Sequence, residues 1–472
     1  MPTSSRFKIV QYPAVGASYE SPSLPASAQR TVNMYPEALQ NGLTDVVLHN
    51  FPGLKKRLSG VASEFDRGEH VFKNILYQVA GGAFYRVTST FGRVSLGSIA
   101  GSGRVSMENN GTTMVIVTGG DGEYTFDGTT LTPTALGTNP TNVEYLNSRF
   151  LYDDDDGRVG VTAVASTTVP GGNFFSPESA PDALVRTYVF NQFAYLFGEK
   201  TIEPWQNVIS GTPPYERMNG AIIENVGLGG RAAIAHTEKA IYFVSDTGDA
   251  QQLQGFSPTQ ISTVAISNAW RGYTLTDAIV QTADILGLDF VIFSFPTDLR
   301  TWCYVEQYGL WFELENGTDK GRWLGNSIIE AYGLILVADF ATGNIYELDP
   351  DTFTDNGVTT VRERIFQPLA GETFGTPRQF YQMQEFGLSI ETGLGNTSEL
   401  NPLIAISFST NGGKSYGNER FKNVGQEGEY LTDVKVSSNQ HFKDMTVKIR
   451  YTEPNKFSLF SSYIKIRESG AQ

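Results

Sequence analysis

Four consecutive carboxylates form the densest group of potential metal ligands in the chain. Asp153–Asp156 precedes Gly157, and calcium is bound by clustered carboxylate oxygens. The run lacks the alternating ligand spacing of a calcium loop and lies between the apolar stretches 150–152 and 159–161. We interpret it as a solvated turn between two strands, with a weak calcium site as the alternative. We predict no metal site and no cofactor.

A glycine-rich segment, Asn225–Arg231, loosely resembles a dinucleotide-binding loop. Such a loop needs a helix directly after it, because the helix N-terminus holds the pyrophosphate. Here the strand-like stretch 241–244 follows within a few residues. The sequence therefore indicates that no nucleotide is bound at this position.

Nucleophiles and bases show no catalytic arrangement either. Cys303 lies in an apolar, strand-like context typical of a buried small side chain, and a lone cysteine forms no intrachain disulfide, which fits a reducing cytoplasm. No histidine pair has the spacing of metal ligands, among His49, His70, His236 and His441. A carboxylate pair for glycoside hydrolysis stays open, because acid and base can come from distant strands. We predict that the chain is not an enzyme.

One hairpin is similar to a known structural turn. Ser409–Tyr416 resembles the Asp-box hairpin of sialidases, with Asn411 in the acidic position. The motif occurs once, and the sequence shows no matching arginine triad. We interpret it as a turn, although a sialidase-like propeller that binds or hydrolyses glycans is the alternative function.

Composition indicates the elements that must carry these residues. The 472 residues include 49 Gly, 22 Tyr and 30 Phe, and only 18% are charged. Abundant glycine and aromatic residues are typical of many short strands joined by tight turns. No signal-peptide core follows the N-terminus, and no run approaches the roughly 18 apolar residues of a membrane helix, so we expect a soluble chain without a membrane span.

A strand-and-turn unit repeats from about residue 70. Taking one apolar residue per unit, neighbouring units lie roughly 35 to 50 residues apart, the spacing of β-propeller blades. The marker residues are Tyr77, Val115, Phe150, Tyr195, Tyr242, Val291 and Ile335. We predict an all-β protein with a β-propeller-like body of undetermined blade number. A stack of sandwiches or a solenoid is the alternative.

The boundaries of the predicted domains follow changes in composition and in the pattern of apolar residues. Residues 1–60, rich in proline, form an extended arm, and 61–350 form the propeller. Residues 351–375 are a polar linker, and the alternating strands of 376–472 form a separate β-sandwich-like domain. We expect the arm to join this last domain in one platform. Its apolar residues would then be buried against the C-terminal domain or a neighbouring subunit, namely Val32, Met34, Tyr35, Phe51 and Leu54.

Charge is distributed unevenly between these parts. Residues 1–60 hold 6 Lys+Arg against 3 Asp+Glu, and residues 401–472 hold 10 against 7. The remaining middle holds 19 against 40. A body this acidic does not bind DNA by neutralising phosphates, although it can surround a duplex that slides past it.

Several stretches, in the same order along nearly the whole chain, resemble one known family. They include Thr31–Glu37, Phe51–Arg57, Gly101–Met107 and Gly227–Ser245. They are similar to the tail-hub family of Salmonella-type short-tailed bacteriophages, also called packaged-DNA stabilisation protein, tail accessory factor or tail nozzle. The chain departs from the family's pattern around residues 250–400 and at its N-terminus. The residues that carry the resemblance are Val32, Asn33, Met34, Phe51, Pro52, Gly53, Gly101, Gly103, Arg104, Val105, Pro181, Asp182, Gly198, Thr201, Ile202, Glu203, Gly227, Asn411 and Gly413.

The resemblance implies a structural protein of the virion tail that passes through the host cytoplasm during assembly. It implies a hexameric hub that closes and extends the portal channel, stabilises packaged DNA and forms the conduit for genome ejection. The implied partners are other copies of the chain, the portal-adaptor ring protein, the tail needle and a tailspike or tail fibre. DNA would pass through the ring without sequence recognition.

Overall fold

The protein is almost entirely β-structure, as predicted. Its helical elements in the described part of the chain are one short α-helix, α1 (Val264–Trp270), and one 3-10 turn, η1 (Gly371–Phe374). A propeller and a β-sandwich account for the strands, which confirms the predicted fold class. The computed structural model describes residues 7–16, 18–39, 45–61, 64–136, 138–179, 182–317, 320–374, 376, 379–396 and 399–469.

Successive antiparallel sheets form the propeller blades in chain order, and the first four lie between residues 66 and 224. The first two are β7–β10 (Asp66–Phe72, Ile75–Ala80, Ala83–Val87, Arg93–Ser98) and β11–β14 (Ser106–Asn109, Met114–Val117, Glu123–Phe126, Leu131–Pro133). The next two are β15–β18 (Pro140–Leu146, Arg149–Asp154, Val159–Val161, Phe174–Phe175) and β19–β22 (Leu184–Phe190, Phe193–Gly198, Thr201–Asn207, Tyr215–Arg217), with β23 (Ile223–Glu224) added to the latter.

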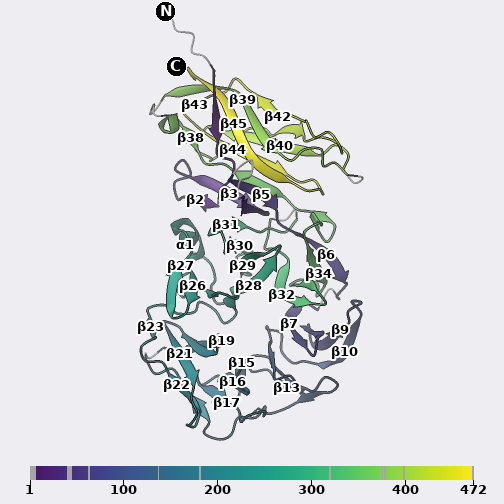
Figure 1. Ribbon diagram of the computed structural model, residues 1–472, viewed down its shortest axis with the longest axis vertical. Helices are drawn as coiled ribbons and strands as arrows, with labels where there is room; N and C mark the ends of the chain where they lie inside the picture. The colour runs from purple at the N-terminus through teal and green to yellow at the C-terminus, as the bar shows by residue number, and fades with distance from the viewer. Residues whose placement is uncertain are drawn as a thin grey trace, which may run out of the picture.

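Three more sheets complete the ring. The fifth and sixth are β24–β27 (Ile234–His236, Ile241–Val244, Ala250–Gln254, Ser257–Gln260) and β28–β31 (Ile279–Ile285, Leu288–Phe295, Arg300–Val305, Leu310–Glu313). The last contains β32–β34 (Gly325–Ala331, Leu334–Asp339, Ile345–Asp349). The inner strand of the last sheet contacts β7 of the first, so the described sheets close a ring of seven blades around an axis (Figure 1).

An N-terminal strand closes this ring. In the last blade the outer position is taken by β6 (Gly53–Leu58), which pairs antiparallel with β34 in the register Leu54↔Leu348. Without β6 the edge of β34 would expose unpaired backbone groups. The predicted boundary at residue 60 is therefore wrong for this strand, because residues 53–58 belong to the propeller rather than to a platform.

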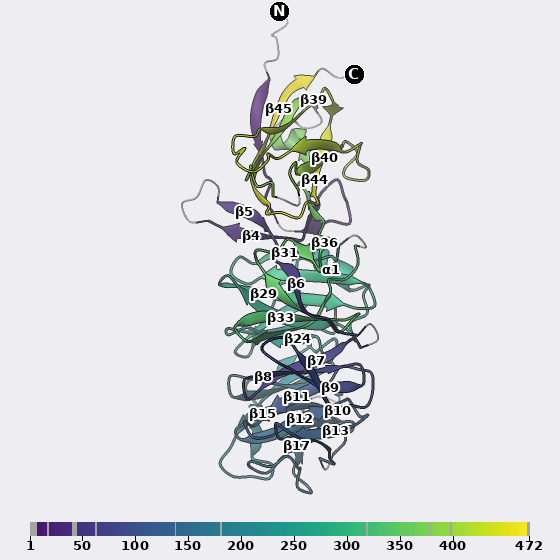
Figure 2. The same ribbon diagram turned by 90° about the vertical axis from the view of Figure 1, so that its right-hand side faces the viewer.

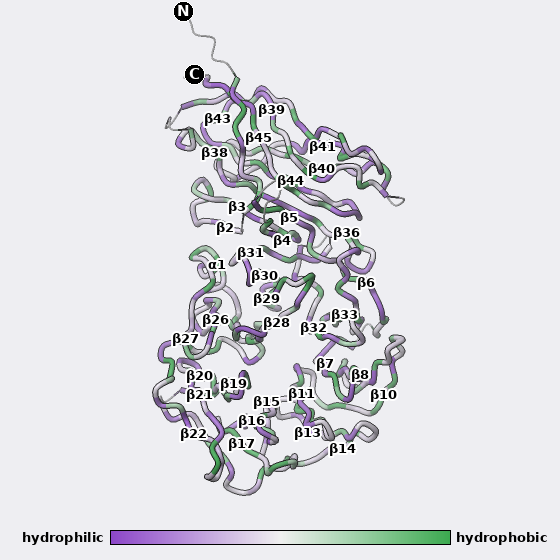
Figure 3. Tube along the Cα trace, in the orientation of Figure 1, coloured by the Kyte–Doolittle hydropathy of each residue, from purple (hydrophilic) through white to green (hydrophobic). Residues whose placement is uncertain are grey.

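Tight turns with left-handed residues join the first two strands of several blades. Residues with positive φ occupy both central positions, which matches the twist of the flanking strands. These turns are Lys73-Asn74, Asn147-Ser148, Asn191-Gln192, Leu286-Gly287 and Tyr332-Gly333. The second strand of several blades is apolar on both faces, because it packs between neighbouring blades. β12, β25 and β29 are such strands, and β29 is labelled in Figure 3.

The C-terminal domain is a sandwich of two sheets. One sheet has the order β4 (Met34–Ala38), β5 (Val46–Asn50), β45 (Ser458–Ser469), β39 (Phe380–Ile390) and β42 (Val434–Ser437), with β1 (Lys8–Tyr12) on β45 and β43 (His441–Phe442) on β39. The facing sheet contains β37 (Arg362–Ile365), β44 (Asp444–Tyr451), β40 (Leu403–Ser409) and β41 (Arg420–Asn423), with β38 (Leu369–Ala370) on β44. The sandwich lies on the rim of the propeller, beyond blade β28–β31, and not on its axis (Figures 1 and 2).

One strand makes the two domains continuous. β3 (Ala28–Val32) pairs with β31 of the propeller at Val32↔Glu313 and with β37 of the sandwich at Thr31↔Arg364. β2 (Tyr19–Glu20) pairs with β3. The predicted linker 351–375 is also structured, because β35 (Thr354–Asp355) and β36 (Val358–Thr359) extend the last blade and β37 enters the sandwich. Hydrogen-bonded strands, rather than a flexible linker, connect the domains.

The apolar residues of the N-terminal segment are divided between two cores. Met34 packs in the sandwich core with Leu48 and Phe386. Tyr35, Phe51 and Leu54 instead belong to a core shared with the propeller, which corrects the prediction that they cover only the C-terminal domain or a neighbour. The propeller side of that core includes Phe290, Phe312 and Trp323.

Candidate functional site

The propeller axis contains a cavity of about 1030 Å³. Its walls are the inner strands β7, β11, β15, β19, β24, β28 and β32, together with the loops that enter them. Arg104, Arg186, Arg231 and Arg322 line it, together with Glu69, Glu108, Glu144 and Asp277. The structure thus gathers charged side chains that lie far apart in the sequence.

The arginines brace the ring from the inside. Arg104 donates from Nη1 to the carbonyl of Asn326 at 2.9 Å, across the junction between blades. Arg186 donates to the carbonyl of Arg231 at 3.0 Å and to Glu144 at 3.2 Å. Backbone carbonyls and one carboxylate therefore bind part of each guanidinium across the blade junctions, whereas Nε of Arg186 has no hydrogen-bond partner among the described residues.

Burial changes the charge state of the cavity acids. It raises the pKa of Glu144 to about 7, although Arg186 opposes the shift. It raises the pKa of Glu69 well above the ordinary value, and the nearby Asp66 adds to the shift. Neither oxygen of Glu69 has a hydrogen-bond partner among the described residues. Both shifts favour the protonated form, because a charged carboxylate would be poorly solvated in this cavity.

Tyr188 and His236 connect the remaining wall. The Tyr188 hydroxyl lies 2.7 Å from Nδ1 of His236 on the next blade, and burial lowers the pKa of that histidine. The sequence did not predict this cavity, because its residues come from different repeats. The inner strand of each repeat contains a charged or polar residue, and this recurring feature could have indicated the axial cavity.

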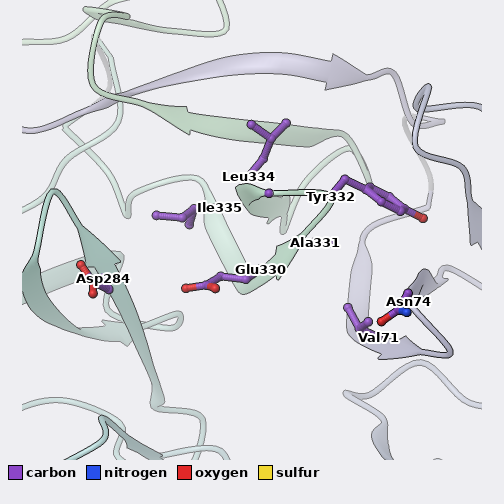
Figure 4. A pocket seen from close by; sticks show the side chains of 9 residues that line it. Val71, Asn74, Asp284, Glu330, Ala331, Tyr332, Leu334 and Ile335 are labelled. Atoms are coloured by element: carbon purple, nitrogen blue, oxygen red, sulfur yellow. The ribbon is translucent and has the colours of Figure 1, made fainter.

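A second hollow, of about 620 Å³, opens where the inner strands end. Figure 4 shows Asp284 and Glu330 beside it, with Tyr332 and Asn74 on the opposite side. Asp284 accepts a hydrogen bond from the backbone N–H of Gly287 at 3.0 Å, as in a turn. In the described part of the chain no group of three or more His, Cys, Asp or Glu residues could hold a metal ion.

The run Asp153–Asp156 is only partly the solvated turn interpreted from the sequence, because the turn contains Asp155 and Asp156 alone. Asp153 lies in β16 and is buried, where it accepts hydrogen bonds from Asn142 at 3.0 Å and from the Thr187 N–H at 2.7 Å. Asp154 accepts from the side chain of Arg158 at 2.8 Å. Half of the run is therefore structural rather than solvated, because β16 continues to Asp154.

The family motif Gly101–Met107 begins as a loop between the first two blades. The guanidinium of Arg67 donates to three carbonyls, those of Gly103 at 2.6 Å, Gly81 at 2.9 Å and Ala100 at 2.8 Å. The loop continues through Arg104 and Val105 into the cavity wall. Gly101 has φ 76°, a conformation that favours glycine. This motif therefore shapes the entrance of the axial cavity.

A second set of family residues organises the blade β19–β22. Asp182 accepts from the N–H groups of Lys200 and Thr201 at 2.8 and 3.0 Å, and it packs against Gly198. Ile202 is buried, and the fully buried Glu203 accepts from the N–H groups of Glu178 and Ser179 at 2.9 and 2.6 Å. Pro181 lies outside the described residues.

Glycine at 227 has a packing reason. A Cβ there would lie 2.0 Å from the carbonyl oxygen of Glu199. Gly53 is similar, because a Cβ would lie 2.5 Å from the carbonyl oxygen of Thr354. Both positions mark close backbone approaches rather than ligand contacts.

The remaining family residues hold the domain junction and one hairpin. Asn33, at φ 53°, donates to the carbonyls of Glu315 at 3.0 Å and Val361 at 2.9 Å. Val32 and Met34 are buried on either side of it, and Pro52 follows the buried Phe51. In the hairpin, Asn411 accepts from the Ser415 N–H at 3.0 Å, and Gly413 has φ 80°.

Cys303 is buried, and burial raises the pKa of its thiol well above the ordinary value. No helix in the described ranges is long and apolar enough to cross a membrane. The side chains that the sequence singled out thus serve folding at separate places, and the structure does not bring them together in one reactive site.

Comparison with known proteins identifies two regions. Residues 16–353 match the family model described as bacteriophage P22 Gp10, beta-propeller, and residues 371–467 match the model described as bacteriophage P22 Gp10, beta-sandwich. A curated relative, the "Tail hub protein gp10" of Salmonella phage P22, is 25% identical over 324 residues. That alignment covers 60% of this chain and 65% of the relative.

Alignments with solved structures are more distant. The WD40 beta propeller domain of Doa1 aligns with 63% of this chain and 97% of that domain, at 11% identity and a TM-score of 0.42. BamB from Moraxella catarrhalis aligns with 72% of this chain and 97% of that structure, at 9% identity and a TM-score of 0.38.

Proposed function

The chain belongs to the bacteriophage P22 Gp10 family, and on this premise we propose that it is the tail hub of a short-tailed phage. The observation that carries the proposal is the match of both domains to the two family models, in chain order and over most of the sequence. The alignment spans less than two thirds of the curated relative. The activity and the partners of the whole relative therefore enter here as part of the proposal.

In the finer form of this proposal, six copies form a ring below the portal-adaptor ring. The ring closes and extends the portal channel, retains packaged DNA and later conducts it into the cell. Partners at its surfaces are the adaptor protein, the tail needle and a tailspike or fibre, and assembly takes place in the host cytoplasm before the protein enters the virion.

The connections between the strands and domains support a rigid wall for the proposed ring. β6 closes the propeller, β3 joins propeller and sandwich in one hydrogen-bonded sheet, and arginines brace the axis. The axial cavity of about 1030 Å³ is lined by side chains from all seven inner strands. We infer that the DNA conduit lies between copies and not along the axis of one propeller.

The test is electron microscopy of the purified full chain mixed with portal complexes that carry the adaptor ring. A hub gives closed rings coaxial with the portal, whereas free chains beside bare portals would contradict the proposal. Retention of the genome in filled heads, with and without the chain, then tests DNA stabilisation.

A glycan hydrolase remains the alternative, favoured by one observation. The cavity gathers several carboxyl groups, among them Glu144 with a raised pKa of about 7, and a glycosidase uses a carboxylic acid with a raised pKa beside a second carboxylate. In the hub proposal these arginines serve as braces, because Arg104 and Arg186 are engaged by neighbouring carbonyls. Turnover of sialosides or receptor polysaccharide that disappears in Glu144→Gln would favour the hydrolase instead.

A further inference from the structure

The sandwich exposes an unusual group of large apolar side chains at one end. Two loops meet there, where the Gly393 N–H donates to the Val424 carbonyl at 3.2 Å and Asn401 accepts from Gln426 at 2.6 Å. We call the exposed residues of this region the apolar tip. They are Leu400, Leu403, Phe421, Tyr430 and Leu431.

The side chains of the apolar tip are not buried within the chain itself. Tyr430 is 69% exposed and Leu431 is 99% exposed. Phe421 adds an exposed aromatic ring on β41, which forms the edge of its sheet and pairs only with β40 in the described structure. Exposed apolar side chains clustered at a sheet edge are typical of a surface that another protein covers.

The loops of the apolar tip carry mainly acidic residues, although Arg420 and Lys422 flank Phe421 on β41. Glu399, Glu427 and Glu429 lie in the same loops, and Glu427 and Glu429 are exposed. Lys456 lies nearby, but it is paired with Glu391 at 2.9 Å. The surface that covers the tip should therefore offer apolar contact with a basic surround.

The opposite end of the same sandwich has this character. β1 and β45 pair in the register Lys8↔Ile466 and Ile9↔Lys465, and β1 is an edge strand. Ile9 is 65% exposed, Lys8 and Arg467 are exposed, and the Arg467 guanidinium lies 4.9 Å from the centre of the Phe7 ring. We call Lys8, Ile9, Lys465 and Arg467 the basic end, which has Glu468 as an acidic neighbour.

The two surfaces cannot meet within one chain. In Figure 1, β45 ends at the upper left of the sandwich and β40 and β42 lie to the right. β1 pairs with residues 462–466 of β45, near that upper-left end. Two complementary surfaces at opposite ends of one domain generate a head-to-tail contact, which closes a ring when the rotation between copies permits.

We propose that the apolar tip of one copy docks on the basic end of the next copy, so that the sandwiches form the inter-subunit contacts of the assembly. This inference rests on the proposed hub function, which it extends by naming the surface of self-association. The contact buries Tyr430 and Leu431 of one copy against Ile9 of its neighbour, with the tip glutamates facing Lys8 and Arg467.

Two double variants of the full chain separate the surfaces. The tip variant is Tyr430→Ser with Leu431→Ser, and the basic-end variant is Lys8→Glu with Arg467→Glu. The control is Ile209→Ser, a fully exposed apolar residue on the propeller. All five substituted residues are exposed, so unchanged thermal transitions show that the three variants fold.

Sedimentation velocity and mass photometry across a concentration series measure the assembly. We expect the wild type and Ile209→Ser to associate equally. Each double variant should associate more weakly, with a dissociation constant raised roughly tenfold or more. Mixing the two variants should give dimers that grow no further, because one intact tip still meets one intact basic end. A contact through identical patches would give no such rescue.

The two proposals fail in different ways. Wild-type rings on portal complexes together with fully assembling double variants would overturn this interface and leave the hub function standing. Double variants that fall apart, with dimers on mixing but no attachment of the wild type to portals, would support the interface and contradict the hub function. A wild type that stays monomeric at all concentrations would overturn the interface.

Discussion

Arg30 is the residue whose removal should most weaken the joint between propeller and sandwich. It lies on β3 and reaches three carboxylates, Glu313 at 2.6 Å, Glu315 at 2.5 Å and Glu363 at 3.5 Å. Glu313 and Glu315 belong to the propeller side, and Glu363 lies on β37 of the sandwich. The variant Arg30→Ala therefore leaves three carboxylates without their common cation, and among the described residues only Glu315 keeps a second pair, with Arg300 at 3.7 Å.

The magnitude follows from burial. The carboxylate side chains are only 7 to 9% exposed and that of Arg30 is 18% exposed. Removing one partner of a buried ion pair typically costs 3–5 kcal/mol. Because the site retains some solvent, we expect a loss of about 3 kcal/mol in the free energy of unfolding at pH 8.

The pH dependence gives this prediction its sign. Burial already raises the pKa of Glu315, and Arg30 opposes that shift. Without Arg30 the pKa rises further, so the folded variant binds a proton that the unfolded chain releases. Stability from such a group is present at low pH and is lost as the pH rises through the folded-state pKa. The penalty of Arg30→Ala should therefore be smaller at pH 5 than at pH 8.

Urea unfolding followed by tryptophan fluorescence measures the effect, because Trp311 and Trp323 are buried near this joint. The matched control is Arg57→Ala, which removes the Arg57–Glu347 pair on the propeller surface, with a 2.7 Å hydrogen bond from Nε. We expect the control to cost less than about 1 kcal/mol. Equal losses in the two variants, or a penalty for Arg30→Ala that grows on acidification, would refute the reasoning.

Three further predictions test the cavity, the glycines and the thiol. The pKa of Glu144 is about 7 against an ordinary 4.5. The stability that this carboxyl contributes is therefore present below pH 4.5 and is lost as the pH rises through 7. In urea unfolding, Glu144→Gln should remove up to about 3 kcal/mol of the difference in stability between pH 5 and pH 8. Gly227→Ala should lower the free energy of unfolding by about 3 kcal/mol, because the added Cβ meets the Glu199 carbonyl. Gly103→Ala should change it by less than about 0.5 kcal/mol, because no atom lies within 4 Å of the added Cβ. Equal shifts of the thermal transition in the two variants would contradict this difference. The buried Cys303 thiol should react with a colorimetric thiol reagent only on unfolding, so rapid labelling of the native protein would show that it is accessible.

Local sequence predicted the blades because each blade is a local structure. The marker residues lie on strands of successive sheets, and the stretches around Tyr77, Tyr242 and Val291 became the buried second strands of their blades. Such strands are apolar on both faces whichever partner they find, so their pattern is visible without knowledge of the partner.

Long-range pairing was not predictable in the same way. β6 contains Lys55, Lys56 and Arg57, which resemble a basic surface segment, and it pairs with residues 345–349. Its alternation shows that it is a strand, but nothing local indicates which of several free edges it completes. The short helix α1 was missed for a related reason, because Trp270 at its end is fixed by packing against Phe293 and Phe295 of a neighbouring blade.

The functional surfaces were even less visible, because they depend on side chains brought together from separate repeats. Arg104 and Arg186 lie in different blades, and their common cavity exists only when the ring closes. Family resemblance could identify Arg104 as a motif residue, but not that it donates to the Asn326 carbonyl at 2.9 Å on the last blade. Sequence motifs therefore located fold-determining contacts better than they located surfaces for partners.

The N-terminal segment explains how one chain can transmit force between two domains. Residues 28–32 bridge the propeller and the sandwich, the paired strands β4 and β5 add to the sandwich, and residues 53–58 close the propeller. Pulling the sandwich away from the propeller must break the β3 ladders and disturb the strand that closes the ring. Because these contacts share one short segment, the orientation of the domains and the closure of the propeller are mechanically coupled. In a ring joined through its sandwiches, this coupling would hold each propeller at a fixed angle to the channel.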